Sequence, residues 1–452
     1  MERMLIIGPA IWNTALQKLA AYKTDTSIPT EVVTIEWIEA NVQGVDAPER
    51  IKRTIESQHR LNGVDLVLLA GDINHFPVRF VRARNTEWGD KYYPSDLYYA
   101  DLYDASGAFE DWDATGDGIY AEMDFSGGSS TEKFNIDKIN IRPDVSVGRV
   151  PASDLAEFQR YVSKVISYEC AASESYWYDS PTDWVKRALF VVDGGPSPFG
   201  DEAQSDQQAV PLTQIGFDVL KRYQDTAPWN TASKQQRAAE ISRVLNEGVG
   251  FLHYNGHGTH TDFENWYDTA DVAALNNAAR LPIVIALACY TARFNTDRDS
   301  YLTLLGGNWT GSSTPKPSRP QPAPLQPAAH DLDSLAEEFL VKHEAGAIAY
   351  LGAVSKYEQG GKALGRYLIE AYRNQSKPPV LGTLWREAMT RFVQNELSGG
   401  TVGMGPYYAF IHVHKVMLFG DPSLRVGGLP YPEPLTLVRD MTPTTMAHAL
   451  GL

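Results

Sequence analysis

Residues 249–294, VGFLHYNGHGTHTDFENWYDTADVAALNNAARLPIVIALACYTARF, form the stretch that decides the fold. Two apolar runs, Val249–Tyr254 and Ile283–Ala288, are continuous rather than alternating and are bounded by glycine or proline. Such runs are typical of short strands buried in a parallel sheet. The first leads to His257 within an Asn-Gly-His-Gly motif, and the second leads to Cys289. The stretch therefore predicts two buried strands that each end in a reactive side chain.

Side chains just beyond the carboxyl ends of neighbouring parallel strands share one crevice. We therefore expect His257 and Cys289 to meet, although 32 positions separate them. An imidazole within reach can convert a thiol to a thiolate. The backbone N–H groups of Gly258 and Cys289 would then face the oxygen of a tetrahedral intermediate. A lone cysteine at a strand end is more often a small buried apolar residue, so the pairing of the two strand ends is what favours an acyl-transfer site.

Length and composition favour a globular protein of about two domains. The chain has 452 residues, of which 43% are apolar and 11% aromatic. A net charge of −16, from 56 acidic and 40 basic residues, argues against nucleic acid as the main partner and favours cationic peptides or metal ions. With only Cys170 and Cys289 present, no disulfide framework is expected and Cys289 should be a free thiol.

The apolar run near the amino terminus is too short for a signal peptide, and no run reaches the length of a membrane span. We therefore expect no membrane insertion, and either a cytoplasmic chain or a mature secreted form. The sequence leaves the oligomeric state open.

Residues 1–175 are expected to form an α/β subdomain, because apolar strand-like runs alternate with helical patterns. The expected strands are 4–9, 32–36 and 65–70, with helices over 11–22 and 48–61 between them. This β-α-β-α-β order predicts a parallel sheet.

The twelve residues from Asp111 to Glu122 have the spacing of a calcium-binding loop. Oxygen-bearing side chains occur at Asp111, Asp113 and Thr115, followed by glycine at the sixth position, Asp117, and a carboxylate at the twelfth. A solvated acidic turn is the alternative. We expect a structural calcium ion, because these carboxylates would repel one another without a cation.

Residues 184–426 are expected to form the second α/β subdomain. A strand over Ala188–Val192 ends in Asp193, whose carboxylate could accept a hydrogen bond from His257 and fix its tautomer. A Pro/Ser-rich insertion at about 296–331 should be a mobile loop, and the tail 427–452 is Pro-rich.

Several motifs together resemble one family, in that family's order. They are Pro94–Asp101, Val147–Arg149, Asp193–Ser197, Asn255–Gly258 with Trp266, Ile285–Cys289 with Phe294, and Phe419–Ser423. The chain resembles the gingipain-type (C25) cysteine peptidases of the caspase-like clan over nearly its whole length. The resemblance implies two side-by-side α/β sandwich subdomains with mainly parallel sheets, the second of them caspase-like.

The resemblance implies a cysteine endopeptidase acting on protein or peptide substrates, with no cofactor for the chemistry. Cys289 would be the nucleophile, His257 the general base and acid, and Gly258 and Cys289 the oxyanion donors. Asp193 stands where the family carries a glutamate that orients the histidine, so the carboxylate is kept on a shorter side chain.

The resemblance also implies cleavage after arginine, and after lysine as an extension, through a carboxylate in the P1 pocket. Counting back from Asp225 places this carboxylate at Asp201, whereas the local Ser-Asp pair would place it at Asp206. Asp201 as a plain helix cap is an equally good interpretation. Tyr357 would stack on the arginine stem.

Caspase-like enzymes are often processed after the catalytic cysteine, so self-processing in the insertion is a further hypothesis. Arg298 is the preferred site, because Lys316 and Arg319 are each followed by proline.

Two other function classes compete with the peptidase interpretation. A catalytically inactive caspase-like binding scaffold would be expected to lose His257 or Cys289, and both are present. A zinc hydrolase could use His253, His257 and His260 with Asp262 or Glu264, but glycines on both sides of His257 break the helix that this ligand spacing requires.

Overall fold

The computed structural model describes residues 2–85, 89–125, 135–177, 183–194, 202–294, 333–356, 361–375, 378–397 and 406–429. Expectations for Asp201, Arg298 and Tyr357, for the 296–331 insertion and for the tail beyond Leu429 concern residues outside these ranges.

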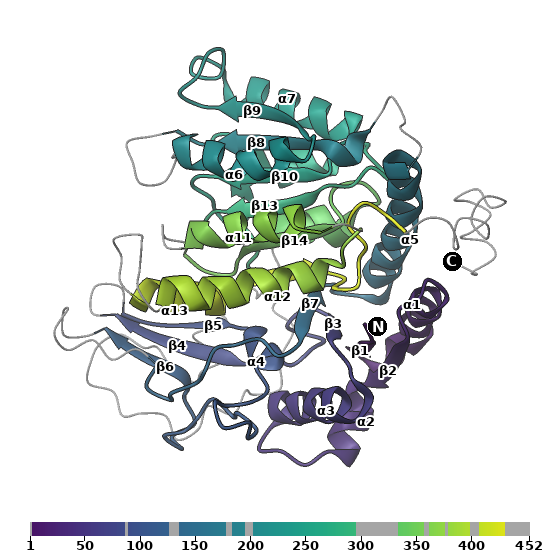
Figure 1. Ribbon diagram of the computed structural model, residues 1–452, viewed down its shortest axis with the longest axis vertical. Helices are drawn as coiled ribbons and strands as arrows, with labels where there is room; N and C mark the ends of the chain where they lie inside the picture. Colours follow the sequence, from purple (N-terminus) through teal and green to yellow (C-terminus); the bar gives the residue numbers. More distant parts are fainter. Residues whose placement is uncertain are drawn as a thin grey trace.

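The main feature of the fold is one continuous sheet of ten strands. Its strands are β1 (Met4–Gly8), β2 (Thr30–Thr34), β3 (Leu66–Ala70), β7 (Ser146–Val150), β8 (Arg187–Val192), β9 (Asp218–Tyr223), β10 (Phe251–Asn255), β13 (Ile283–Leu287), β14 (Ala349–Ala353) and β15 (Val416–Gly420). Their order across the sheet is β2-β1-β3-β7-β15-β14-β13-β10-β8-β9 (Figure 1). The predicted α/β architecture with mainly parallel strands is confirmed, and the two expected sheets are joined edge to edge.

Strand direction divides this sheet into two halves. The strands β2, β1, β3, β7 and β15 are mutually parallel and form the N-terminal half. The strands β14, β13, β10, β8 and β9 are also mutually parallel and form the C-terminal half. The two halves meet at the antiparallel pair β14–β15, so their carboxyl ends lie at opposite edges of the sheet.

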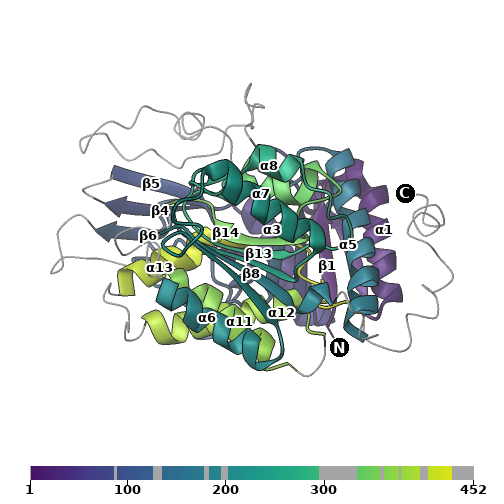
Figure 2. The ribbon, with the colours of Figure 1, turned by 90° about the horizontal axis from the view of Figure 1, so that it is seen from above.

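Helices cover both faces of the sheet. They are α1 (Asn13–Asp25), α2 (Ile35–Asn41), α3 (Ala47–Asn62), α4 (Leu97–Ala100), α5 (Leu155–Trp177), α6 (Glu202–Gln214), α7 (Lys234–Glu247), α8 (Thr269–Ala273), α10 (Leu335–Glu337), α11 (Lys362–Arg373), α12 (Leu381–Phe392) and α13 (Pro406–Lys415). In Figure 2, α6, α11 and α12 lie on one face of the C-terminal half, and α7 and α8 lie on the other. Within the described ranges, no helix is both long and apolar enough to span a membrane.

Local sequence signals account for the helix boundaries. The side chain of Asp46 accepts a hydrogen bond from the Glu49 N–H at 3.0 Å and so caps α3, which has Pro48 in its first turn. The same helix ends at Gly63, whose φ of +68° suits a residue without Cβ. These signals explain why the helix expected over 48–61 forms almost as predicted.

A second, smaller sheet was not predicted from the sequence. It contains β4 (Phe80–Asn85), β5 (Gly89–Pro94) and β6 (Tyr120–Phe125), in the order β5-β4-β6. The acidic loop of residues 111–122 leads into β6, so the candidate calcium loop lies beside this sheet.

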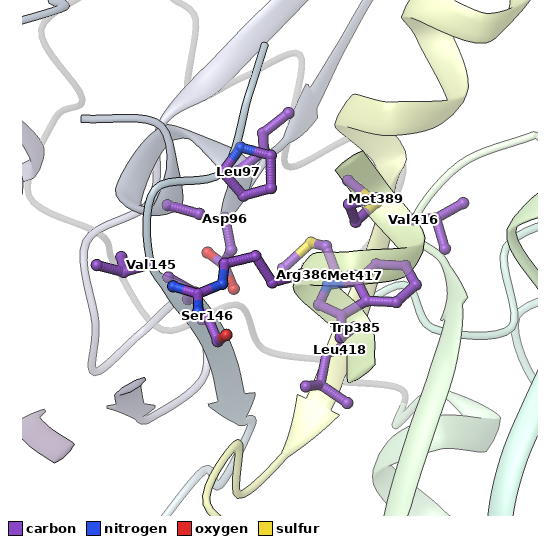
Figure 3. A pocket seen from close by; sticks show the side chains of 13 residues that line it. Asp96, Leu97, Val145, Ser146, Trp385, Arg386, Met389, Val416, Met417 and Leu418 are labelled. Carbon is purple, nitrogen blue, oxygen red and sulfur yellow. The ribbon is translucent and has the colours of Figure 1, made fainter. Parts of the chain in front are cut away.

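The two halves are joined by buried contacts rather than by a linker alone. The Phe294 ring, beyond β13 of the C-terminal half, packs on the Phe419 ring of β15 with ring centres 5.5 Å apart, and the Lys23 ammonium group on α1 contacts Glu169 on α5 at 2.9 Å and Asp421 after β15 at 2.8 Å. A small cavity of about 20 Å³, room for about one water molecule, lies between β7, β15 and α12 and is lined by Ser146 and Met417 among others (Figure 3). One hydrophobic core therefore runs through both halves.

Candidate active site

Three strands of the C-terminal half end in register. The last residue of β10 pairs with the last residue of β8 on one side and of β13 on the other. Asp193 follows β8 directly, and His257 and Cys289 each lie two residues beyond β10 and β13. The prediction that the two central strands are parallel neighbours is confirmed, and the third predicted strand lies beside them.

The two glycines that flank His257 bring its loop close to both neighbours. A Cβ at Gly256 would lie 2.4 Å from the Cβ of Asp193, and a Cβ at Gly258 would lie 3.0 Å from the carbonyl oxygen of Cys289. Real side chains do not approach so closely, so only glycine allows this packing. The Asn-Gly-His-Gly motif thus places His257 between the Asp193 and Cys289 turns.

Asp193 is buried at this edge, with 2% of its surface exposed. Its N–H donates to the Asn255 carbonyl at 3.0 Å, and its carboxylate accepts the backbone N–H of His257. Burial raises the pKa of Asp193 to about 6, while the nearby His257 and a hydrogen bond from the Asn265 side chain oppose that rise. In the described part of the chain, its Oδ1 atom has no hydrogen-bond donor.

His257 is exposed at the end of this loop, and its backbone is held firmly. Its carbonyl accepts hydrogen bonds from the Tyr254 hydroxyl at 2.6 Å and from the Glu264 N–H at 3.3 Å. Gly258 lies opposite Phe263 in an antiparallel bridge whose hydrogen bonds are made by the flanking residues. The N–H of Gly258 therefore points away from Phe263.

Cys289 lies half-buried in a tight turn and, within the described residues, neither it nor Cys170 is part of a disulfide. Tyr290 adopts a left-handed conformation with φ +60°, and its carbonyl accepts the Arg293 N–H at 3.0 Å. The Tyr290 N–H donates to the Ser355 carbonyl just beyond β14, at 3.1 Å. The turn is thereby fixed to the next strand of the sheet.

Asn265 is a site residue that sequence reasoning missed. Its φ of +63° turns the backbone so that the side chain reaches Asp193. Arg237 on α7 donates to the Asn265 carbonyl at 3.5 Å and to the Trp229 carbonyl at 2.7 Å, and it stacks 5.1 Å from the Trp266 ring. The only available signal was the tolerance of asparagine for left-handed turns, which is too weak to identify the residue.

The position of His253 argues against the zinc hydrolase interpretation. Its ring is fully buried, stacks on Phe190 at 4.5 Å and contacts the Gln208 side-chain oxygen through Nε2 at 2.6 Å. Burial lowers the pKa of His253 to about 3. Across the described ranges, no three His, Cys, Asp or Glu side chains are placed to hold a metal ion.

Of the candidate P1 carboxylates, the described residues include only Asp206. It contacts the Lys221 ammonium group at 2.8 Å and accepts a hydrogen bond from the Tyr223 hydroxyl at 2.6 Å, which lowers its pKa against the effect of burial. Tyr223 ends β9, the outermost strand, three strands away from the strand of Cys289. Three strand spacings amount to about 14 Å, so the partners of Asp206 belong to the outer edge of the sheet, and its role in the P1 pocket stays a prediction.

Carboxylates of the acidic loop pair with hydrogen-bond donors and a cation of the protein itself. Asp113 accepts hydrogen bonds from the N–H groups of Asp117 at 3.0 Å and Gly118 at 2.9 Å. Glu122, the expected twelfth-position ligand, forms an ion pair with Arg82 at 2.8 Å. Within the described ranges, no three of these carboxylates are grouped so as to hold a metal ion, and calcium stays a prediction.

Asp137 is a second acidic residue that the sequence did not single out. It accepts hydrogen bonds from the N–H groups of Thr115 at 3.3 Å and Glu122 at 2.8 Å, so it closes the acidic loop from outside. Burial, together with the nearby charges of Asp113 and Glu122, raises the pKa of Asp137 to about 6.

Comparisons with known proteins identify the family of the chain. The profile of peptidase family C25 matches residues 2–427. A relative from Archaeoglobus fulgidus, described as an uncharacterized protein, is 23% identical over 369 residues, which cover 78% of this chain and 75% of the relative.

Solved structures show the same fold. The Arg-specific cysteine proteinase gingipain R superposes with a TM-score of 0.63 and 18% identity, covering 94% of this chain and 78% of that one. A complex of the pro- and mature domains of RgpB from Porphyromonas gingivalis gives a TM-score of 0.64 and 18% identity, covering 94% and 79%. The profile match over nearly the whole chain confirms the resemblance seen in the motifs: the protein belongs to peptidase family C25, a family of cysteine peptidases.

Proposed function

We propose that the protein is a cysteine endopeptidase that uses Cys289 as nucleophile and His257 as general base and acid, with Asp193 orienting the imidazole. The observation that carries this proposal is the register of three strand ends, packed so closely that the His257 loop needs glycine on both sides. The carboxylate of Asp193 is buried and one of its oxygens has no donor among the described residues, which supports its role as the acceptor for a ring N–H of His257.

In the acylation step, His257 takes the proton of the Cys289 thiol, and the thiolate attacks the carbonyl carbon of the scissile peptide bond. The C–S bond forms as the carbonyl oxygen gains charge. The C–N bond then breaks, and the imidazolium gives its proton to the leaving amine. The carboxylate of Asp193 favours this step because it stabilises the positive charge on His257.

In the deacylation step, His257 takes a proton from water, and the resulting hydroxide attacks the thioester carbonyl. The C–S bond breaks, the acyl group leaves as a carboxylic acid, and the imidazolium of His257 returns its proton to the Cys289 sulfur. The N–H groups of Gly258 and Cys289 serve as oxyanion donors in both steps. The position of Gly258 against the Cys289 turn, with its N–H directed away from Phe263, supports this assignment.

Cleavage after arginine or lysine is the finer part of the proposal. The acidic character of the chain favours basic substrates, and the structurally similar gingipain R is an Arg-specific proteinase. Because Asp206 is already paired with Lys221 and Tyr223 of β9, Asp201 is the better candidate for the P1 carboxylate, with Tyr357 stacking on the substrate.

The test is the hydrolysis of fluorogenic peptides that differ only at P1, by the wild type and by Cys289→Ala, with thiol and calcium present. Turnover confined to Arg and Lys peptides, absent in Cys289→Ala and weakened at least tenfold in Asp201→Asn but not in Asp206→Asn, is expected. A wild type that turns over no peptide, with Cys289 inert to an alkylating probe, would instead identify an inactive scaffold.

Self-processing at Arg298 is a separate proposal, supported only by the composition of the segment that contains it. Intact-mass analysis of the purified wild type and Cys289→Ala tests it. We expect a cut after Arg298 in the wild type alone. A wild type that stays one intact chain while cleaving peptides at full rate would contradict self-processing and leave the peptidase proposal standing.

Structural calcium at the acidic loop also remains a proposal, and it concerns stability rather than chemistry. Binding would require Glu122 to leave Arg82 and join Asp111, Asp113, Thr115 and Asp117 around the ion. Thermal unfolding with calcium and with a chelator is the test. A Tm raised by several degrees in calcium, and unchanged by calcium in Asp113→Ala, is expected. Equal Tm values in both conditions would argue against the site.

A further inference from the structure

Residues 333–337, here called the bridging segment, contact both catalytic loops through their backbone. The N–H of Leu335 donates to the carbonyl of His260 at 2.9 Å, in the loop that carries His257. The next N–H, of Ala336, donates to the carbonyl of Thr291 at 3.0 Å, two residues after Cys289. Two consecutive amides thus join the loop of the general base to the turn of the nucleophile.

The bridging segment is itself held rigidly. Ser334 and Glu337 form a reciprocal capping box, in which the Glu337 carboxylate accepts the Ser334 N–H and hydroxyl at 2.7 Å each. Both side chains are buried, as are Leu335 and Ala336. The two bridging amides are the first N–H groups of α10, which have no acceptor inside a helix and are therefore available to other loops.

Helix α5 fixes the bridging segment from behind. Lys342 contacts Asp333 at 2.7 Å and Glu157 on α5 at 2.5 Å. Lys342 lies at the end of the π-helix η3 (Glu338–Lys342). Carbonyl groups of η3 accept hydrogen bonds from two cationic side chains of α5. Arg160 donates to the Val341 carbonyl, and the buried Lys164 donates to the Phe339 and Leu340 carbonyls at 2.9 Å each.

Helix α5 also belongs to the N-terminal half of the molecule. Its Phe158 packs on Trp12 next to α1, with ring centres 5.7 Å apart, and its Tyr161 hydroxyl accepts the N–H of Asp421, just after β15, at 2.7 Å. In Figure 1, α5 runs alongside the strands of the C-terminal half toward α1. A path of buried contacts therefore leads from α1 through α5 to both catalytic loops.

We propose that the bridging segment is a positioning element that sets the separation of the His257 loop and the Cys289 turn, with Lys342 and α5 holding it in place. The inference rests on the proposed peptidase function. The opposite side of the His257 loop is already fixed by Tyr254 and Glu264, so loss of the bridge frees only the side toward Cys289. A displacement of about 1 Å between reacting groups can cost about 100-fold in rate.

The first test is Leu335→Pro, which removes the N–H that reaches His260. Leu335 is the first residue of α10, where proline is well tolerated, and Ser334 before it is extended with ψ 162°. Leu335→Val is the matched control, because it also trims the buried side chain but keeps the N–H. We expect kcat to fall about 10- to 100-fold in Leu335→Pro with KM within twofold, and to stay within threefold in Leu335→Val. Equal losses in both variants would overturn the proposal.

A second variant, Lys342→Gln, keeps the proposal testable if Leu335→Pro does not fold. Its control is Arg222→Gln, which removes an ion pair with Glu240 of similar exposure on β9, far from the bridge. We expect a kcat loss of about tenfold in Lys342→Gln and none in the control. Unchanged kcat in Lys342→Gln, with the protein folded, would also overturn the proposal.

The rate of Cys289 alkylation by iodoacetamide at neutral pH separates this inference from the proposed function. It reports the thiol–imidazole contact without any peptide substrate. We expect a parallel fall in Leu335→Pro and Lys342→Gln relative to their controls, even if no peptide in the panel is cleaved. Alkylation equally fast in the variants and the controls would contradict the bridge, whatever the outcome with peptides.

Discussion

Each half of the sheet places a buried aspartate and a histidine at its strand ends, but only the pair in the C-terminal half belongs to the proposed catalytic site. In the N-terminal half, Asp72 follows β3, and His75 lies three residues further on in the same loop. The Oδ1 atom of Asp72 accepts hydrogen bonds from the N–H groups of Asn74 and His75 and contacts His75 Nδ1, at 2.9, 3.1 and 2.9 Å. Its Oδ2 atom accepts the Asn74 side-chain amide at 3.1 Å. Both oxygens of this carboxylate are satisfied locally.

In the C-terminal half, Asp193 is equally buried but depends on other strands. Its donors are the His257 backbone and Asn265, and one oxygen has no donor within the described residues. A buried carboxylate that its own loop satisfies stabilises that loop, whereas one left incomplete costs stability and stays available to a partner. From this comparison we expect Asp72 to stabilise its own loop and Asp193 to be available to a partner at the proposed catalytic site.

Of the variants that distinguish the Asp193–His257 pair from the Asp72–His75 pair, Asp193→Asn should have the largest effect on activity. The amide cannot stabilise the imidazolium of His257 and can select the wrong tautomer, so we expect kcat to fall about 100- to 10,000-fold. Steady-state hydrolysis of the preferred P1 peptide is the measurement. A loss below about threefold would remove Asp193 from the catalytic unit.

Gly258→Ala should have the next largest effect. A Cβ there would lie 2.7 Å from the Thr291 side chain and 3.0 Å from the Cys289 carbonyl, so the two catalytic loops must separate. We expect about a tenfold or larger loss of kcat/KM. The control is Gly8→Ala at the end of β1, where a Cβ would lie 3.0 Å from that of Ala70. That variant should lose stability but keep its activity, and similar activity losses in both would show that the effect is not specific to the site.

The raised pKa of the Asp193 carboxylate should make the stability of the folded protein depend on pH. Because burial raises its pKa in the folded state from 3.8 to about 6, the folded protein binds the proton more tightly than the unfolded chain. Its contribution to stability is complete below pH 3.8 and is lost as the pH rises through about 6, a loss of at most about 3 kcal/mol. Asp193→Asn should therefore raise the Tm relative to the wild type at pH 8 but not at pH 4. Equal differences at both pH values would contradict the raised pKa.

Asp72→Asn should have the smallest effect on activity. It removes a charged acceptor from several hydrogen bonds, so we expect a loss of about 1–3 kcal/mol in stability with kcat/KM within twofold. The hydrogen bond to Asp72 raises the pKa of His75, so this pair stabilises the wild type fully below the unfolded pKa of 6.5 and less as the pH rises through the folded value. Denaturant unfolding at pH 6 and pH 8 should show this dependence weakened in the variant. A large loss of peptidase activity would mean that the two edges are coupled.

Much of the C-terminal half could be predicted, because the sequence patterns that indicate its strands and turns are local. The continuous apolar runs before His257 and Cys289 identify buried parallel strands, and the glycines beside His257 indicate a close backbone approach. Parallel strands that are neighbours bring their carboxyl ends together, so the meeting of the three loops followed from the strands alone.

The rest depends on long-range contacts that leave no local pattern. The last strand, β15, reverses direction relative to β14 and joins the N-terminal half, which turns two expected sheets into one. The bridge from Leu335 and Ala336 uses backbone amides, which every residue except proline carries. The roles of Asn265 and Asp137 depend likewise on where distant loops pack, and the spacing of the acidic loop gives no sign that Glu122 pairs with Arg82, 40 positions earlier.

The pH dependence of Cys289 alkylation, compared between the wild type and His257→Ala, tests the central claim most directly. If the strand ends form one catalytic unit, the wild-type thiol should react as a thiolate well below its ordinary pKa of about 8.5, and His257→Ala should return the profile to about that value. Superimposable profiles with midpoints near 8.5 in both proteins would show that His257 does not act on Cys289, and the proposed mechanism would be wrong.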